Sequence, residues 1–287
     1  TGVDVLIITG MREGAPVATF SPLLSSSKLL DIRVEAGART LQDRRGSHHR
    51  DEVAVFDQEP LDYQPSFVFD NNSVGEEAVK LFGKEYLLPY MHEDLQALQT
   101  LIPSVKNFPR PGVEFRHVLN ISERPRGLQL CTSLLEHRFI HEWPGIDALV
   151  CCEAGGFIYA SALASRVKLP LALIREAGKL PPPTISTTKL PSHITSMAHN
   201  GDVKSKRIEM GCDVLAAGAS VVVVDDVLAT GTTLCAVIEL LQKARIRLGN
   251  IKVVVIAEFP IHGGRQLLRQ RGFSRVSVDS LLVLNGA

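Results

Sequence analysis

The sequence predicts an α/β fold built on a parallel sheet, and three observations support this prediction. From about residue 149 onward, short apolar runs alternate with helical patterns, as in βαβ units. One run contains four consecutive valines, Val221 to Val224, which is typical of a strand buried on both faces. The 287 residues are also enough for two domains. We therefore expect a smaller N-terminal α/β unit at 1–92 and the parallel-sheet domain at 93–287.

The expected elements follow from these patterns in chain order. In the larger unit we predict strands at 148–152, 171–174, 221–224, 252–258 and 276–284, and helices at 158–167, 233–244 and 262–271. In the smaller unit we predict strands at 5–8, 29–34 and 66–69, and helices at 75–82 and 92–101. Residues 179–201 are rich in Pro, Ser, Thr and His, which predicts a long mobile loop of the kind that forms lids.

Composition excludes several functional classes. The formal net charge is zero, which gives no electrostatic case for binding nucleic acid or an anionic membrane. No apolar run reaches the about 18 residues of a membrane span. The five cysteines are an odd number in mostly apolar surroundings, which predicts reduced thiols and a cytoplasmic location. The chain starts at Thr1 with a core strand almost at once, so we expect that it begins within a domain.

The most informative segment follows the four valines and precedes an apolar helix pattern. Its residues are Asp225, Asp226, Ala229, Thr230, Gly231, Thr232 and Thr233. Free backbone N–H groups at a helix start bind phosphate, and threonine hydroxyls add further donors. Aspartates repel phosphate, but they accept hydrogen bonds from ribose hydroxyls or hold a divalent cation. The pattern therefore indicates a ligand in which a ribose carries phosphate.

This segment resembles the motif with which type I phosphoribosyltransferases bind 5-phosphoribosyl pyrophosphate (PRPP). The resemblance implies that residues 229–233 bind PRPP. It also implies that Asp225 and Asp226 hold Mg²⁺ and act in catalysis by orienting the ribose hydroxyls. The fold implied is the parallel-sheet type I phosphoribosyltransferase fold.

Residues 108–116 extend the resemblance towards the base. They contain prolines and a glycine, and they look like the base-binding entry of adenine phosphoribosyltransferases. The resemblance implies that Glu114, Phe115 and Arg116 bind the base, with the Phe115 ring stacked on a purine. Taken alone, this run is more often a Pro-rich linker. Its distance before a PRPP motif favours the base site.

Two further segments match the pyrophosphate side of such a site. Residues 173–184 are similar to the family's pyrophosphate-contacting strand end and the start of its flap, so Arg175 and a catalytic Lys179 would contact the leaving group. Two solvated basic residues are the alternative interpretation. Gly155 and Gly156 lie in the segment that corresponds to the pyrophosphate loop, where glycine lets backbone approach phosphate.

Three departures from the family pattern stand out. Gly155 replaces the Arg of the family's pyrophosphate loop, which removes one cation. Thr232 replaces the second Gly of an Ala-Thr-Gly-Gly-Thr run, and since Thr disfavours positive φ we expect a reshaped loop. The family's flap carries a Glu thought to protonate the purine, but residues 180–208 contain none, and Pro191 stands near its place. His193 is one replacement acid, and a flexible surface histidine is the other interpretation.

Residues 1–92 resemble the second half of a P-loop nucleotide kinase. Residues 5–12 look like a strand that ends at an acceptor-binding turn, and 67–72 look like the strand before the closing helix. Arg39, Arg44 and Arg45 stand where such kinases have a phosphate-binding lid, although a solvated face explains them equally well. No GxxxxGK[ST] run occurs, so this unit alone cannot be a competent kinase.

Together these observations predict a purine phosphoribosyltransferase, adenine preferred, with Mg²⁺ as cofactor. Its expected partners are small molecules: PRPP, and a purine base or nucleoside monophosphate. The resemblance also implies a homodimer. Two alternatives stay open, namely a non-catalytic PRPP- or nucleotide-binding protein and a fragment of a bifunctional kinase–phosphoribosyltransferase.

Overall fold

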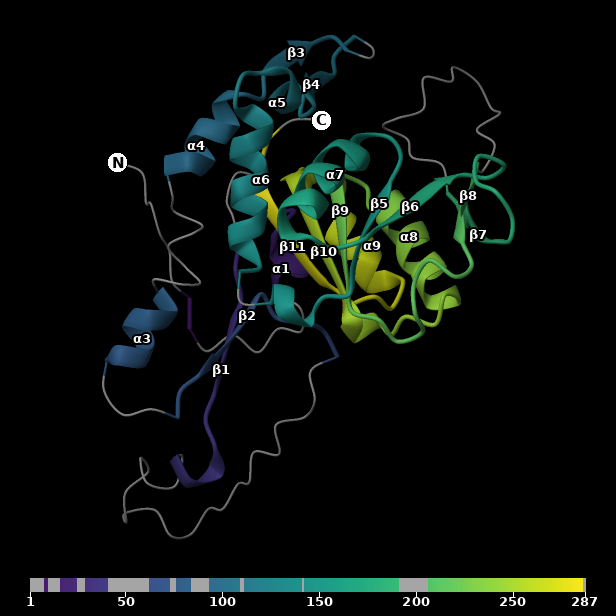
Figure 1. Ribbon diagram of the computed structural model, residues 1–287. Coiled ribbons are helices and arrows are strands. Elements are labelled where there is room, and N and C mark those ends of the chain that lie inside the picture. The colour runs from purple at the N-terminus through teal and green to yellow at the C-terminus, as the bar shows by residue number, and fades with distance from the viewer. Residues whose placement is uncertain are drawn as a thin grey trace.

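A seven-stranded sheet in the order β11-β10-β9-β5-β6-β8-β7 is the centre of the molecule (Figure 1). The computed structural model describes residues 8–9, 16–24, 29–40, 62–72, 76–83, 93–108, 111–140, 142–190 and 206–285. The sheet strands are β5 (Ala148–Cys152), β6 (Leu171–Glu176), β7 (Thr184–Lys189), β8 (Lys206–Gly211), β9 (Val221–Leu228), β10 (Ile251–Glu258) and β11 (Ser277–Val283). Neighbours from β11 to β6 are parallel, whereas β8 is antiparallel to both β6 and β7.

Helices cover both faces of this sheet. The helices of the larger unit are α4 (Glu93–Thr100), α5 (Asn120–Glu123), α6 (Gly127–Arg138), α7 (Gly155–Val167), α8 (Thr232–Lys243) and α9 (Gly264–Gln270), with 3-10 turns at Trp143–Gly145, Leu248–Asn250 and Pro260–His262. Val221 and Val223 of β9 pack into a cluster that includes α8, whereas Val222 and Val224 pack into another that includes α6 and α7. The prediction of a strand buried on both faces is confirmed.

Three expected boundaries were wrong. The helix predicted at 158–167 begins at Gly155, so Gly155 and Gly156 lie in its first turn. The strand predicted at 221–224 continues to Leu228, so Asp225 and Asp226 lie within β9 and not after it. The pairing with β10 sustains it, because Val255 pairs with Asp225 and Glu258 with Leu228. The long loop predicted from residue 179 contains β7, which pairs along its whole length with β8. Residues 191–205 lie outside the described part of the chain.

The N-terminal segments, as we call described residues 8–9, 16–24, 29–40, 62–72 and 76–83, form a smaller arrangement. They contain α1 (Pro16–Phe20), β1 (Ile32–Glu35), β2 (Phe67–Asp70) and α3 (Glu77–Phe82). β1 and β2 form a parallel pair, so two of the three strands expected here are confirmed. Residues 5–7 of the third strand, and Arg44 and Arg45, lie outside the described residues.

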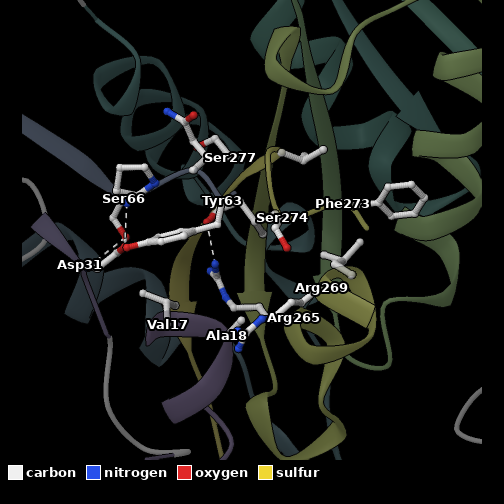
Figure 2. A pocket seen from close by; sticks show the side chains of 15 residues that line it. Val17, Ala18, Asp31, Tyr63, Ser66, Arg265, Arg269, Phe273, Ser274 and Ser277 are labelled. Carbon is white, nitrogen blue, oxygen red and sulfur yellow. Dashed lines mark hydrogen bonds between the residues drawn. The ribbon is translucent and has the colours of Figure 1, made fainter. Parts of the chain in front are cut away.

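The N-terminal segments contact the end of the larger unit. The backbone N–H of Gln64 donates to the Ser274 carbonyl at 2.7 Å, and Arg269 Nη1 donates to Thr19 Oγ1 at 2.8 Å. A cavity of about 60 Å³ lies at this joint (Figure 2).

A hairpin of β3 (Ser104–Lys106) and β4 (Glu114–Arg116) lies apart from the main sheet, beside α5 (Figure 1). Just after the hairpin, the Val118 carbonyl accepts a hydrogen bond from Tyr159 Oη of α7 at 3.0 Å. Among the helices that the structure describes, none combines the length and the apolar character needed to cross a bilayer.

Candidate active site

The residues expected to bind PRPP lie where the strand order of the sheet reverses, between β9 and β5. From β5 the chain passes through α7 to β6, and from β9 it passes through α8 to β10 on the other side. Ligands in open α/β sheets bind outside the carboxyl ends of strands at such a switch point. β5 pairs with β9 only as far as Val224, so Asp225 and Asp226 lie beyond the last partner on that side.

The two aspartates are largely withdrawn from water. Asp225 is 7% exposed, and its Oδ1 accepts the backbone N–H of Asp226 at 3.0 Å. Burial, with the neighbouring Asp226 charge second, raises the pKa of Asp225 well above its usual value. Burial also raises the pKa of Asp226. Two adjacent carboxylates in this state gain from a bound cation or from hydroxyl donors, which stabilise their charged form.

The loop after β9 has the backbone geometry of an anion site. Gly231 has φ of +79° and caps α8, whose first residue is Thr232. The positive φ therefore falls on the glycine, and Thr232 is helical and carries no positive φ. The expected reshaping of the loop stays a prediction. The Thr230 and Thr232 hydroxyls lie 3.3 Å apart, and Thr233 follows in the first helical turn. Their hydroxyls join the free N–H groups at the start of a 12-residue helix.

The start of α9 supports this loop from behind. A Cβ on Gly231 would lie 2.8 Å from the Gly264 carbonyl oxygen, and a Cβ on Gly264 would lie 2.4 Å from that of Ala229. Real Cβ atoms do not approach backbone so closely, so both positions require glycine. The 229–233 loop is thus pressed directly against α9.

The start of α7, where Gly155 and Gly156 lie, is equally tight against the acidic pair. A Cβ on Gly155 would lie 2.2 Å from Asp226 Oδ2, and a Cβ on Gly156 would lie 2.9 Å from the Val224 carbonyl oxygen. An arginine at 155 would require the Asp226 carboxylate to move. The glycine at position 155 is therefore what allows the Asp226 carboxylate to lie where it does.

The two predicted pyrophosphate cations lie together, but a carboxylate that sequence reasoning missed holds them. Glu153 Oε2 accepts from Arg175 Nε at 3.2 Å, and Oε1 accepts from Lys179 Nζ at 2.9 Å. The backbone N–H of Glu176 also donates to Glu153 Oε1, at 2.6 Å. Burial alone would raise the pKa of Glu153, but the Glu176 N–H and the two cations outweigh it and hold the pKa below its usual value. The signal in the sequence that could have identified Glu153 is its position two residues before Gly155.

Glu209 of β8 is the second residue that sequence reasoning missed. Its Oε1 accepts the backbone N–H groups of Gly178, Lys179 and Leu180 at 2.8, 3.1 and 3.1 Å, so it fixes the turn that carries Lys179. Its Oε2 accepts the Thr184 hydroxyl at 3.2 Å. A glutamate thus does lie in the β7–β8 hairpin, one residue beyond the stretch in which none was found. His193, the suggested replacement acid, lies outside the described residues.

The predicted base-binding residues share the β3–β4 hairpin. The Phe115 ring packs edge-on against the Phe108 ring, with centroids 5.0 Å apart. Glu114 Oε1 accepts a short hydrogen bond from the Ser104 hydroxyl and lies 3.7 Å from Arg116 Nη2. Arg116 Nε also donates to the Asn285 carbonyl at 3.3 Å. The hairpin presents an aromatic surface, of which Phe108 is a part that the sequence did not single out.

The acidic pair fits a metal that arrives with its substrate. Among the residues that the structure describes, no group of three or more His, Cys, Asp or Glu side chains could hold a metal by itself. Mg²⁺ in phosphate chemistry is bound through one or two carboxylates, with phosphate oxygens and water as the other ligands. Asp225 and Asp226, whose pKa values are raised by burial, supply that number of carboxylates.

Comparisons with known proteins identify the family of this chain. The family model described as phosphoribosyl transferase domain matches residues 117–276. The adenine phosphoribosyltransferase of Marinomonas sp. is 33% identical over 191 residues, which are 66% of this chain and 96% of that protein. That of Sorangium cellulosum is 32% identical over 195 residues, 68% of this chain and 90% of that protein.

Solved structures show the same relationship. The APRTase of Giardia lamblia, complexed with 9-deazaadenine, is 26% identical with a TM-score of 0.57, covering 66% of this chain and 96% of that one. The adenine phosphoribosyltransferase of Saccharomyces cerevisiae, whose complex contains adenine, is 26% identical with a TM-score of 0.56, covering 66% of this chain and 99% of that one. The N-terminal kinase resemblance stays a prediction. With a family model that spans residues 117–276 and this site at the switch point, the chain belongs to the phosphoribosyl transferase domain family.

Proposed function

We propose that this protein transfers the 5-phosphoribosyl group of PRPP to a purine base, with adenine preferred, and releases pyrophosphate. The observation that supports this most directly is the meeting, at one switch point, of the Asp225–Asp226 pair, the loop 229–233 and the cations Arg175 and Lys179. These groups match the parts of PRPP in turn: ribose, 5-phosphate and pyrophosphate. The adenine preference rests on the relatives named above.

In the proposed reaction, the bond between ribose C1 and the pyrophosphate oxygen breaks while a base nitrogen forms a bond to C1 and loses its proton. The 229–233 loop binds the 5-phosphate with backbone N–H groups and threonine hydroxyls. Asp225 and Asp226 orient the ribose hydroxyls and stabilise the positive charge that develops on the sugar. Arg175 and Lys179 stabilise the negative charge on the departing pyrophosphate.

The remaining parts of the proposal concern metal, base and assembly. Mg²⁺ would be held by the two aspartates and would neutralise charge on the pyrophosphate. The aromatic surface of Phe108 and Phe115 would stack on the base. The β7–β8 hairpin would be the stem of a flap that excludes water. We also propose a cytoplasmic homodimer, and a division of the chain into a 1–92 unit and a 93–287 domain.

The test is release of pyrophosphate from PRPP and Mg²⁺ across a panel of purine bases, with PRPP binding measured by calorimetry on the same sample. Release that depends on the base, with adenine fastest, is the expected result. The double variant Asp225→Asn, Asp226→Asn should fold but lose PRPP binding, whereas Asp213→Asn, an exposed acid of the same domain, should bind as the parent does. PRPP binding without release for any base would overturn the proposed transferase in favour of a non-catalytic PRPP-binding protein.

A further inference from the structure

The carboxylate of Glu153 occupies the position between Arg175 and Lys179 that an anion would need. Three donors converge on it: Arg175 Nε at 3.2 Å, Lys179 Nζ at 2.9 Å and the backbone N–H of Glu176 at 2.6 Å. A terminal phosphate group is bound by donors of the same kinds: an ammonium, a guanidinium and a backbone N–H. In the structure, the Glu153 side chain fills this cradle.

The two carboxylates offset most of the positive charge of this cluster. Arg175, Lys179 and Lys206 are positive, and Glu153 and Glu176 are negative, since Glu176 Oε2 lies 3.5 Å from Lys179 Nζ and 3.6 Å from Lys206 Nζ. Position 155 adds no cation, because it is glycine. An incoming pyrophosphate therefore meets a cluster whose positive charge Glu153 has reduced.

Glu153 is also held more firmly than the cations that it binds. Its side chain is 18% exposed, against 35% for Arg175 and 44% for Lys179. Its own backbone N–H donates to the Ile174 carbonyl at 3.1 Å, and its carboxylate is fixed by the Glu176 N–H. When pyrophosphate binds, the cations must turn away from a carboxylate that stays in place.

We propose that Glu153 competes with pyrophosphate for Arg175 and Lys179, and so weakens pyrophosphate binding and speeds release of this product. The inference rests on the proposed function for the identity of the anion. Glu153 is a positioning residue in this account, because it acts on the pyrophosphate through the two cations. Pyrophosphate can bind the two cations only after their ion pairs with Glu153 break.

The experiment measures inorganic pyrophosphate binding by calorimetry, with Mg²⁺ present, to the parent and to three variants. Glu153→Gln removes the charge but keeps an acceptor for the Glu176 N–H, and it should bind pyrophosphate about tenfold tighter, as loss of a charge a few ångströms away predicts. Glu153→Asp keeps the charge and should bind no tighter than the parent. Glu176→Gln removes a more exposed charge and should change the affinity less than Glu153→Gln does.

Turnover supplies a second readout that a merely structural role would not give. Glu153→Gln should show stronger product inhibition by pyrophosphate and a lower kcat if product release limits the rate, with an unchanged affinity for ribose 5-phosphate, which carries no pyrophosphate. Both effects should be larger at low salt, because they are electrostatic.

Each other outcome overturns the inference. If Glu153→Gln binds pyrophosphate more weakly or equally, or if Glu153→Asp tightens binding as much, the carboxylate does not compete. If none of the four proteins binds pyrophosphate, the cradle does not take this anion. Binding of PRPP by the parent is scored separately and decides the proposed function, so the two failures are distinguishable.

Discussion

The β1–β2 pair and the central sheet are both made of parallel strands rich in branched and aromatic residues, yet they differ in burial. Val223 of β9 is 1% exposed, whereas Val34 of β1 is 55% exposed. Helices cover both faces of the central sheet, while the described contacts of β1 and β2 are chiefly with each other and with Phe82 of α3, whose ring lies 4.9 Å from that of Phe69. Apolar pattern therefore predicts a strand, but the number of neighbouring layers decides how much that strand stabilises the fold.

The joint between these two regions combines polar and apolar groups. Figure 2 shows Val17 and Ala18 of α1 near Arg265 and Arg269 of α9, and Asp31 and Ser66 also line the cavity. Asp31 Oδ1 accepts both the backbone N–H and the hydroxyl of Ser66, at 2.8 and 2.6 Å. Helix α9 thus contacts α1 of the N-terminal segments, and the 229–233 loop at its start.

The largest difference between the regions should appear in their ion pairs. Glu258 is buried and binds Arg265 through two hydrogen bonds of 2.8 Å each, from Nε and Nη2. Glu258→Gln leaves the guanidinium without its counter-charge, and should lower the free energy of unfolding by about 3–5 kcal/mol in denaturant titrations.

The matched substitution in the N-terminal segments is Glu76→Gln. Glu76 pairs with Lys80 at 3.0 Å on the surface of α3, so the expected loss is about 0.5 kcal/mol or less. Equal losses of unfolding free energy for Glu258→Gln and Glu76→Gln would show that the buried ion pair stabilises the fold no more than the exposed one. Ion pairs would then not distinguish the two regions.

Core truncation should separate the regions next. Ile256 of β10 is 0% exposed, and Ile256→Ala should cost about 2–5 kcal/mol because it removes three carbons from a packed layer. Ile32 of β1 is 40% exposed, and Ile32→Ala should cost about 1 kcal/mol or less. Chemical denaturation of both variants checks this, and a loss for Ile32→Ala as large as that for Ile256→Ala would mean that β1 is packed as firmly as the central sheet.

Sequence reasoning succeeded where the signal is local. Residues 225–233 form strand end, acidic pair, loop and helix start within one continuous run, so their place could be predicted before any fold was known. Glu209 could not be found this way, because its role depends on the antiparallel register that pairs it with Arg175. Likewise β7 has a polar sequence, and only its pairing with β8 makes it a strand.

The contact between α9 and the PRPP loop gives a smaller effect, located in the site. Gly264→Ala places a Cβ 2.4 Å from the Ala229 carbonyl oxygen, so the loop must shift. We expect PRPP affinity to fall at least tenfold, about 1.4 kcal/mol, while the fold is retained. Gly249→Ala is the matched control, because nothing lies within 4 Å of its Cβ. Unchanged PRPP affinity in Gly264→Ala would show that α9 does not support the loop. Changes at the joint would then not affect the site through α9.

The smallest effect expected is a pH dependence of stability that originates in the flap stem. Burial acts to raise the pKa of Glu209, but the N–H groups of Leu180, Gly178 and Lys179 and the Thr184 hydroxyl outweigh it, so its folded pKa lies below the usual glutamate value. A lowered folded pKa means that the ionised form stabilises the fold at pH above the ordinary glutamate value, about 4.3, and that this contribution disappears as the pH falls through the folded pKa.

The Tm of the parent in thermal melts should therefore fall on acidification below that value. Glu209→Gln, which cannot ionise, should have a lower Tm at neutral pH and a shallower acid decline. An exposed glutamate of α3 provides the control, since Glu77→Gln should leave the difference between neutral and acidic Tm nearly as in the parent. An equal decline of Tm in the parent and in Glu209→Gln would show that the acid sensitivity originates elsewhere. The β7–β8 hairpin would then not be one of the features in which the central sheet differs from the N-terminal segments.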